Sequence, residues 1–152
     1  MRIEDSFLLH ASKEDIWNLF MNVEKLGSCV PGCENVKALS PTEYTAKMEV
    51  KVQFMKFNYE AKGKMKNIVE NESIEVEMNG KPLSSLAGPF QNNILIKLEE
   101  VEPRKVKIHY IMDAQAEGKL ASLGDVLMKG SIQKTADQFS ENVQKLFVGE
   151  NV

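Results

Sequence analysis

The chain has 152 residues, 43% of them hydrophobic and 27% charged, which is ordinary for one folded domain and argues against disorder. No run approaches the roughly 20 apolar residues of a membrane span. The acidic first residues predict no signal peptide. A net charge of −3, with lysines mixed among acids, argues against a nucleic-acid partner. Two cysteines are too few for a disulfide framework, so we expect a cytoplasmic protein.

The first part of the chain predicts a strand and two short helices. Residues 2–10 place apolar side chains on one face at period two, as a strand does. Ser12 and Asp15 form a capping-box pattern directly before a helical apolar repeat. We expect a second short helix over residues 22–28, ended by a turn at Pro31-Gly32.

From Val36 to Ala114 the apolar residues alternate with polar ones, which predicts an antiparallel sheet with one covered face. Turn-forming pairs interrupt this pattern at Ser40-Pro41, Glu70-Asn71, Asn79-Gly80 and Glu102-Pro103. After Gly118 the period becomes helical, and we expect one long helix that ends at Gly149. Its apolar stripe consists of Leu123, Leu127, Ile132, Ala136, Phe139, Val143 and Leu146.

A sheet with one apolar face and a helix with one apolar stripe must cover each other, so the order of elements predicts a two-layer α+β fold. No repeat or linker divides the chain, and we expect a single domain over residues 1–152. The predicted inward face is rich in methionine and aromatic residues, which suits either a flexible apolar ligand or an ordinary filled core.

The residues that could carry chemistry do not form a catalytic or metal-binding set. Cys29 and Cys33 are spaced C-x₃-C, but structural zinc needs four ligands, and the two histidines lie far away in the sequence. We therefore predict packing cysteines and no metal or other cofactor. His109 and Asp113 are predicted to face solvent, away from any cavity, so we predict no catalytic residue.

Four strings of residues carry a resemblance to a known family. They are Ala-Ser-Lys-Glu-Asp-Ile-Trp at 11–17, Cys-Val-Pro-Gly-Cys-Glu at 29–34, Asp-Ala-Gln-Ala-Glu-Gly-Lys-Leu-Ala-Ser-Leu-Gly at 113–124 and Lys-Thr-Ala-Asp-Gln-Phe at 134–139. With these strings and this order of elements, the sequence resembles the G subunit of carbon monoxide dehydrogenase. That family belongs to the START-related (SRPBCC) helix-grip ligand-binding superfamily.

The resemblance implies a START-like helix-grip fold: a curved antiparallel sheet of about seven strands around a long C-terminal helix, with two short helices after the first strand. It also implies an internal cavity and a role as accessory factor to a molybdenum hydroxylase of the carbon monoxide dehydrogenase type. Family members that act at membranes tend to carry a longer apolar tail. This sequence stops at Val152. We therefore expect no stable membrane anchor, and a transient membrane contact stays open.

With a cavity implied, the inward residues become candidates for contact with a lipid- or quinone-like molecule, and Tyr59 and Tyr110 would orient its polar group. The candidates are Met48, Phe57, Tyr59, Met65, Met78, Phe90, Tyr110, Met112, Leu123, Leu127 and Phe139. The long, apolar segment Leu83–Phe90 is a candidate gate over the cavity.

Two alternatives from other functional classes stay open. The first is an enzyme of the same fold, a cyclase or aromatase that uses pocket tyrosines or carboxylates, although we find no inward Asp, Glu or His on the predicted strands. The second is a protein-interaction module with a filled core.

Overall fold

The structure is a computed structural model that describes residues 1–83 and 87–150. Seven strands form one antiparallel sheet in the order β1-β7-β6-β5-β4-β3-β2. The strands are β1 (Arg2–Leu9), β2 (Cys33–Ala38), β3 (Glu43–Val52), β4 (Met55–Val69), β5 (Ser73–Pro82), β6 (Ala87–Glu102) and β7 (Lys105–Glu117). The helices are α1 (Lys13–Met21), α2 (Val23–Gly27), α3 (Gly118–Ser122) and α4 (Asp125–Glu150). The predicted α+β class and seven-stranded sheet are confirmed.

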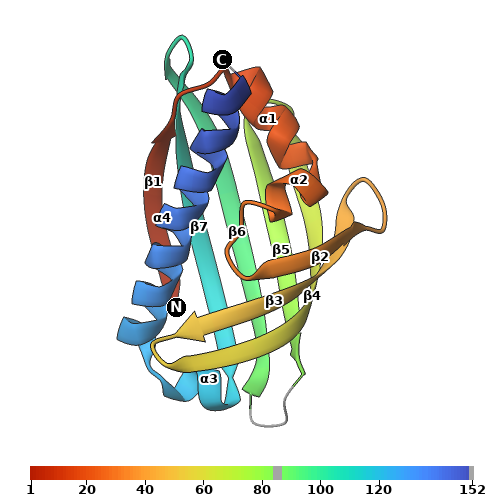
Figure 1. Ribbon diagram of the computed structural model, residues 1–152, viewed down its shortest axis with the longest axis vertical. Coiled ribbons are helices and arrows are strands. Elements are labelled where there is room, and N and C mark those ends of the chain that lie inside the picture. Colours follow the sequence, from red (N-terminus) through yellow and green to blue (C-terminus); the bar gives the residue numbers. More distant parts are fainter. Residues whose placement is uncertain (84–86, 151–152) are drawn as a thin grey trace.

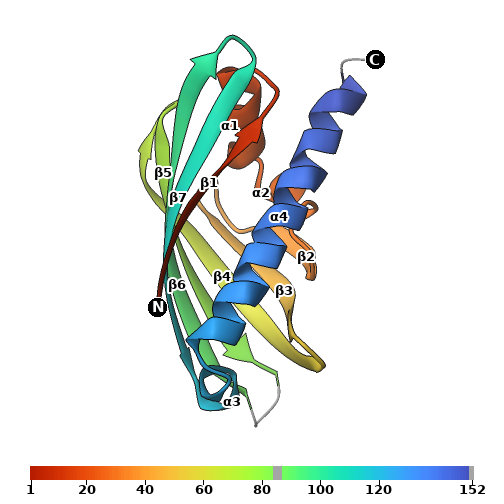
Figure 2. The ribbon, with the colours of Figure 1, turned by 90° about the vertical axis from the view of Figure 1, so that its left-hand side faces the viewer.

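The sheet curves around α4, which runs obliquely across its concave face (Figures 1 and 2). Helices α1 and α2 cover one end of this face, and the short helix α3 lies at the opposite end. We refer to these as the α1 end and the α3 end. The predicted helix-grip architecture, with two short helices after the first strand, is therefore confirmed.

Local sequence explains how the chain enters and leaves the first helices. The Ser12 hydroxyl accepts a hydrogen bond from the Asp15 backbone N–H at 3.1 Å, as an N-cap does. The Asn22 side chain caps α2 in the same way through the Lys25 N–H. Gly32 then turns the chain with a φ of 78°, where a side chain would meet the Glu49 carbonyl oxygen. The predicted turn at Pro31-Gly32 is confirmed.

The chain after β7 differs from the prediction of one continuous helix. Gly118, at a φ of 65°, breaks the strand and starts α3, which ends at Ser122. Helix α4 begins only at Asp125, and it continues past Gly149 to Glu150. The predicted end at Gly149 is therefore one residue early, which is within the usual spread of helix boundaries.

A second difference concerns the turn predicted at Asn79-Gly80, which is wrong. Strand β5 runs through both residues to Pro82. A Cβ atom on Gly80 would lie 2.0 Å from the Phe90 ring, so this glycine makes room for an aromatic side chain of the neighbouring strand. Of the predicted gate, Ala87–Phe90 belong to β6, and residues 84–86 lie outside the described residues.

Three polar contacts hold α4 over the sheet. Near the helix C-terminus, the Gln144 amide oxygen accepts a hydrogen bond from the His10 backbone N–H at 2.7 Å. Two residues earlier, the Asn142 amide donates to the Cys29 carbonyl at 2.9 Å. Towards the N-terminus, the Ser131 hydroxyl donates to the Lys51 carbonyl at 2.8 Å. The helix is therefore fixed near its C-terminal end to the residue after β1 and to the α2–β2 connection, and near its N-terminal end to β3.

Candidate ligand-binding site

The concave face of the sheet is built from alternate residues of each strand, and strand register places them in rows. One row crosses Met65, Val76, Ile94, Met112 and Ile3, and the next crosses Tyr44, Gly63, Met78, Asn92 and Ala114. Paired residues of antiparallel strands point to the same face of the sheet. These rows therefore define one surface that α4 covers.

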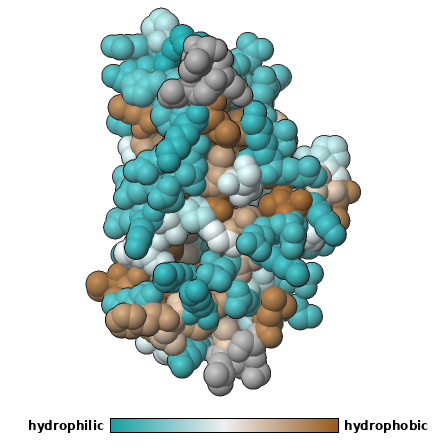
Figure 3. Space-filling model, viewed as in Figure 1, coloured by the Kyte–Doolittle hydropathy of each residue, from teal (hydrophilic) through white to brown (hydrophobic). Residues whose placement is uncertain are grey.

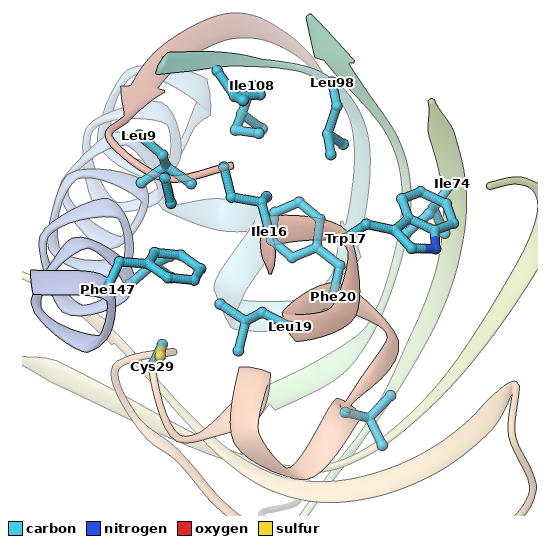
Figure 4. Packing of buried hydrophobic residues seen from close by; sticks show 14 of the residues in the cluster. Leu9, Ile16, Trp17, Leu19, Phe20, Cys29, Ile74, Leu98, Ile108 and Phe147 are labelled. Carbon is cyan, nitrogen blue, oxygen red and sulfur yellow. The ribbon is translucent and has the colours of Figure 1, made fainter. Parts of the chain in front are cut away.

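At the α1 end the strands are packed closely against α1, and a groove lined by Leu19, Leu146 and Phe147 remains between α1, α2 and the C-terminal part of α4. Ile16, Trp17 and Phe20 of α1 insert against residues of β5, β6 and β7, and Phe147 of α4 closes the side (Figure 4). Ile16 and Val143 are 0% exposed. We call this set the α1-end cluster: Leu9, Ala11, Ile16, Trp17, Leu19, Phe20, Val23, Cys29, Met65, Ile74, Leu98, Val106, Ile108, Val143 and Phe147.

A second cluster lies at the α3 end. Its buried members are Val52, Phe57, Tyr59, Ala87, Phe90 and Leu120. The Tyr59 and Phe90 rings meet edge to face, with their centroids 4.7 Å apart. The half-buried residues Met48, Met78, Leu123 and Leu127 pack against this α3-end cluster. Hydrophobic packing therefore concentrates at the two ends of the concave face.

Between the clusters lies a band of inward-facing residues that belong to neither of them. We call this band the waist: Ala46, Ala61, Asn92, Ile94, Tyr110, Met112 and Ala114 on the strands, with Ile132 and Ala136 on α4. Ile94, Met112 and Ile132 are only half-buried, although they face the interior from both walls. Apolar side chains that face inward and still contact solvent indicate space between the walls rather than tight packing.

The space-filling view agrees with this arrangement. Figure 3 shows a hollow beside α4, with hydrophobic residues visible between the helix and the strands to its right. The surrounding surface is mostly hydrophilic in this view. The apolar interior is therefore accessible from solvent along the side of α4.

The structure places all eleven predicted site residues on the concave face or on the segment that covers it. Phe57, Tyr59 and Phe90 belong to the α3-end cluster, with Met48, Met78, Leu123 and Leu127 packed against it. Met65 belongs to the α1-end cluster, and Phe139 packs against that cluster. Tyr110 and Met112 lie in the waist.

The two predicted polar handles differ in their surroundings. Tyr59 is 0% exposed, and its hydroxyl donates a hydrogen bond to the Gly88 carbonyl at 3.1 Å. This hydroxyl proton is therefore not available to a ligand. Burial raises the pKa of Tyr110, and the nearby carboxylates of Asp5 and Asp137 add to this. Tyr110 therefore stays protonated at neutral pH and can donate a hydrogen bond.

Two polar residues of the concave face escaped the sequence analysis. Asp5 pairs with Tyr110 and lies on the same face of the sheet as Ile3 and Phe7. The sequence-based prediction that the strands carry no inward-facing carboxylate is therefore wrong. Asn92 lies between Met78 and Ala114 on the same face. The period-two pattern through Phe90 and Ile94 would have found it.

Neither cysteine belongs to the waist, and His109 lies outside it as well. Cys29 is buried and Cys33 half-buried, both are free, and burial raises the pKa of each thiol. A raised pKa disfavours the thiolate that redox or metal chemistry needs. On the opposite face of the sheet, His109 contacts Glu99 at 2.7 Å. Among the described residues, no three His, Cys, Asp or Glu side chains gather to hold a metal ion.

The sequence matches the model of the carbon monoxide dehydrogenase G subunit (CoxG) family over residues 6–147. The chain belongs to this family. The resemblance noted from the four sequence strings is therefore confirmed. A search of curated proteins finds no match.

Solved structures resemble this CoxG family member along nearly its whole length. A conserved protein from Geobacillus kaustophilus is 20% identical, with a TM-score of 0.90, and the match covers 98% of this chain and 96% of the other. A START superfamily protein from Mycobacterium smegmatis is 10% identical, with a TM-score of 0.69 and coverages of 95% and 94%. An aromatase/cyclase from a Streptomyces species is also 10% identical, with a TM-score of 0.58 and coverages of 99% and 92%. At these identities the likeness shows the fold, which is START-like.

None of the helices within residues 1–83 and 87–150 combines the length and the apolar character needed to cross a bilayer.

Proposed function

We propose that this protein binds a hydrophobic small molecule, lipid- or quinone-like, between the sheet and α4, and that it catalyses no reaction. The observation that carries the proposal is the waist, where Ile94, Met112 and Ile132 face inward yet are only half-buried between two packed clusters. Apolar walls with a few polar groups are typical of small-molecule sites. A ligand there would bury the apolar surface that the protein leaves uncovered.

The ligand would contact the waist and the adjacent edges of both clusters. Tyr110 and Met112 would form its central contacts, since they lie in the waist itself. Seven of the predicted residues would line the α3 side, and Met65 and Phe139 the α1 side. Methionine side chains such as Met48 and Met78 adapt their shape at little cost, which suits a ligand that enters and leaves.

We further propose that the protein serves a molybdenum hydroxylase of the carbon monoxide dehydrogenase type as an accessory factor in the cytoplasm. Membership of the CoxG family supports this partnership. The two free cysteines, Cys29 and Cys33, fit a reducing compartment. This protein would either deliver its bound molecule to the partner enzyme or assist the maturation of that enzyme.

A cyclase- or aromatase-like enzyme is the second candidate function. The observation in its favour is the approach of the Asp5 and Asp137 carboxylates to Tyr110, which brings acid groups to the waist. The raised pKa of Tyr110 argues against it, because an effective acid or base has a pKa near the working pH. Binding without catalysis is therefore the better-supported function.

Native mass spectrometry of the purified protein, with organic extraction of what it carries, tests the proposal. Met112→Trp should fill the waist and abolish the bound mass. Ile111→Trp is the matched control, because Ile111 is the next residue in the strand and faces the opposite side of the sheet. A bound apolar molecule that Ile111→Trp keeps and Met112→Trp loses would establish the carrier.

A bare mass, together with no binding across a panel of apolar ligands, would overturn the proposal. The protein would then be an interaction module whose surface, and not its interior, carries the function.

A further inference from the structure

Asn92 is a polar residue in the middle of an apolar surface. It lies on β6, one of the inner strands of the sheet, and its inward neighbours across the strands are Met78 and Ala114. Above and below it on the same face of β6 are Phe90 and Ile94. None of these side chains is a hydrogen-bonding partner of ordinary strength for an amide.

The Asn92 amide has no partner within the described residues. No hydrogen bond of its side chain is formed there, and the residue is half-buried. Since no buried polar atom of the described chain is left unbonded, the amide atoms of Asn92 must contact the accessible space of the waist. An apolar residue at this position would need no hydrogen-bonding partner. The amide is therefore available to a molecule in the waist.

The strand wall of the waist carries no cationic side chain. The concave positions of the paired strands carry no lysine, arginine or histidine among the described residues. The carboxylates of Asp5 and Asp137 approach Tyr110. The N-terminal ammonium lies at the sheet edge, where it donates to the Ala114 carbonyl at 2.9 Å. A carboxylate bound against the strands of the waist would therefore lose its hydration and meet no cationic side chain of the sheet.

We propose that Asn92 receives the polar group of the ligand, and that this group is an uncharged carbonyl or hydroxyl rather than a carboxylate. The amide can donate to a carbonyl and accept from a hydroxyl, so both neutral groups fit. The rest of the ligand would extend over Ile94, Met112 and Ile132. This inference rests on the proposed function and adds to it the residue and the charge state that select the ligand.

Three ligands of similar size test the inference: valerophenone, a neutral ketone; pentylbenzene, its hydrocarbon counterpart; and 5-phenylpentanoate, a carboxylate. Isothermal titration calorimetry measures each against the natural protein, Asn92→Leu and Asn93→Leu. Asn93 is the matched control, because it is exposed on the outer face between Glu77 and Asp113.

We expect the natural protein to bind valerophenone more tightly than 5-phenylpentanoate by about tenfold or more, since the carboxylate loses its water without compensation. Asn92→Leu should weaken valerophenone binding about fivefold, the size of one neutral hydrogen bond, and leave pentylbenzene binding unchanged or tighter. Asn93→Leu should change neither affinity. Asn92→Leu could also weaken pentylbenzene binding, because the larger side chain fills space in the waist. In that case Asn92→Ala, which opens space, is the deciding variant. It should remove the preference for the ketone over the hydrocarbon.

The outcomes separate this inference from the proposed function. If valerophenone and pentylbenzene bind equally, or if Asn92→Ala keeps the ketone preference, the inference is wrong and the binding function stands. The same holds if 5-phenylpentanoate binds as tightly as the ketone. If the natural protein binds none of the three, the proposed function and the inference fail together.

A stability measurement gives an independent readout. Asn92→Leu should raise the midpoint of thermal unfolding by a few degrees, because it replaces an unbonded amide with apolar contacts. Asn93→Leu should not. A midpoint lowered by Asn92→Leu would mean that the amide stabilises the fold itself, and it would overturn the assignment to a ligand.

Discussion

The α1 end and the waist are built from the same kinds of residue on the same sheet, yet they pack differently. At the α1 end, helix α1 inserts Ile16 and Phe20 into the curve of the sheet, and the residues there are almost fully buried. At the waist only α4 covers the strands, and Ile94 and Met112 are only half-buried. The difference lies in the covering layer and not in the sheet.

Apolar residues on this one surface of the sheet therefore have two different roles. Those covered by two helices supply the stability of the fold, because tight packing removes them from water completely. Those covered by one helix contribute less to stability and keep space for another molecule.

The largest effect is expected from truncating one isoleucine in each region. Ile16→Ala should lower the free energy of unfolding by about 3 kcal/mol, because it opens a cavity in a fully packed cluster. Ile94→Ala should cost about 1 kcal/mol, since its side chain is already half-exposed. Urea denaturation of the two variants measures both values. Equal losses would mean that the waist is as tightly packed as the α1 end.

The tyrosines extend the comparison to alkaline pH. Burial raises the pKa of Tyr44, Tyr59 and Tyr110 above the ordinary value of 10.0, and that of Tyr44, beside the α1-end cluster, to about 12. The folded state therefore holds these protons more tightly than the unfolded state. The resulting stability is complete below pH 10 and is lost as the pH rises towards about 12.

Phenolate absorbance during alkaline titration measures this behaviour. The absorbance step that is lost in Tyr44→Phe should occur at the highest pH. The step that is lost in Tyr110→Phe, which reports the waist tyrosine, should occur at a lower pH. A folded protein in which Tyr44 ionises at its ordinary value would contradict the burial that the structure gives this ring.

A smaller effect is expected at the α3 end, from the hydrogen bond between the Tyr59 hydroxyl and the Gly88 carbonyl. Tyr59→Phe should lower the free energy of unfolding by about 1 kcal/mol, because it leaves a carbonyl at the start of β6 without its partner. Tyr44→Phe is the control, since the Tyr44 hydroxyl makes no hydrogen bond to the described residues. Thermal unfolding of both variants, with hydrogen exchange at β6, would show the difference. Identical midpoints of thermal unfolding for Tyr59→Phe and Tyr44→Phe would mean that the Tyr59 hydroxyl does not stabilise the fold.

Most of the fold was predictable, because period-two alternation and helical period are local signals. The capping pattern at Ser12 and the turn at Pro31-Gly32 predicted how the helices begin and end. The prediction failed where a residue serves a distant contact. Gly80 resembles a turn residue, but its role is to accommodate the Phe90 ring of the neighbouring strand, which no local pattern reveals.

The candidate site was predictable only in part. Alternation correctly indicated which side chains face inward, and it would have indicated Asn92 and Asp5 as well. It could not distinguish Phe57, which is packed, from Met112, which is not, because this depends on where α4 crosses the sheet. It also could not show that the Tyr59 hydroxyl is bonded to Gly88, since that contact depends on the three-dimensional approach of two strands.

The position of α4 also has a consequence for biosynthesis. The helix that covers the concave face has 26 residues and follows all seven strands in the chain. At about 5–20 residues per second, a ribosome needs roughly one to five seconds to make it. Until the helix is in place the apolar face of the sheet has no lid of its own, and β1, the first strand made, must wait for β7, the last, before it gains its partner. The nascent protein therefore passes through a stage in which a chaperone, or the future ligand, can occupy the place of its last helix.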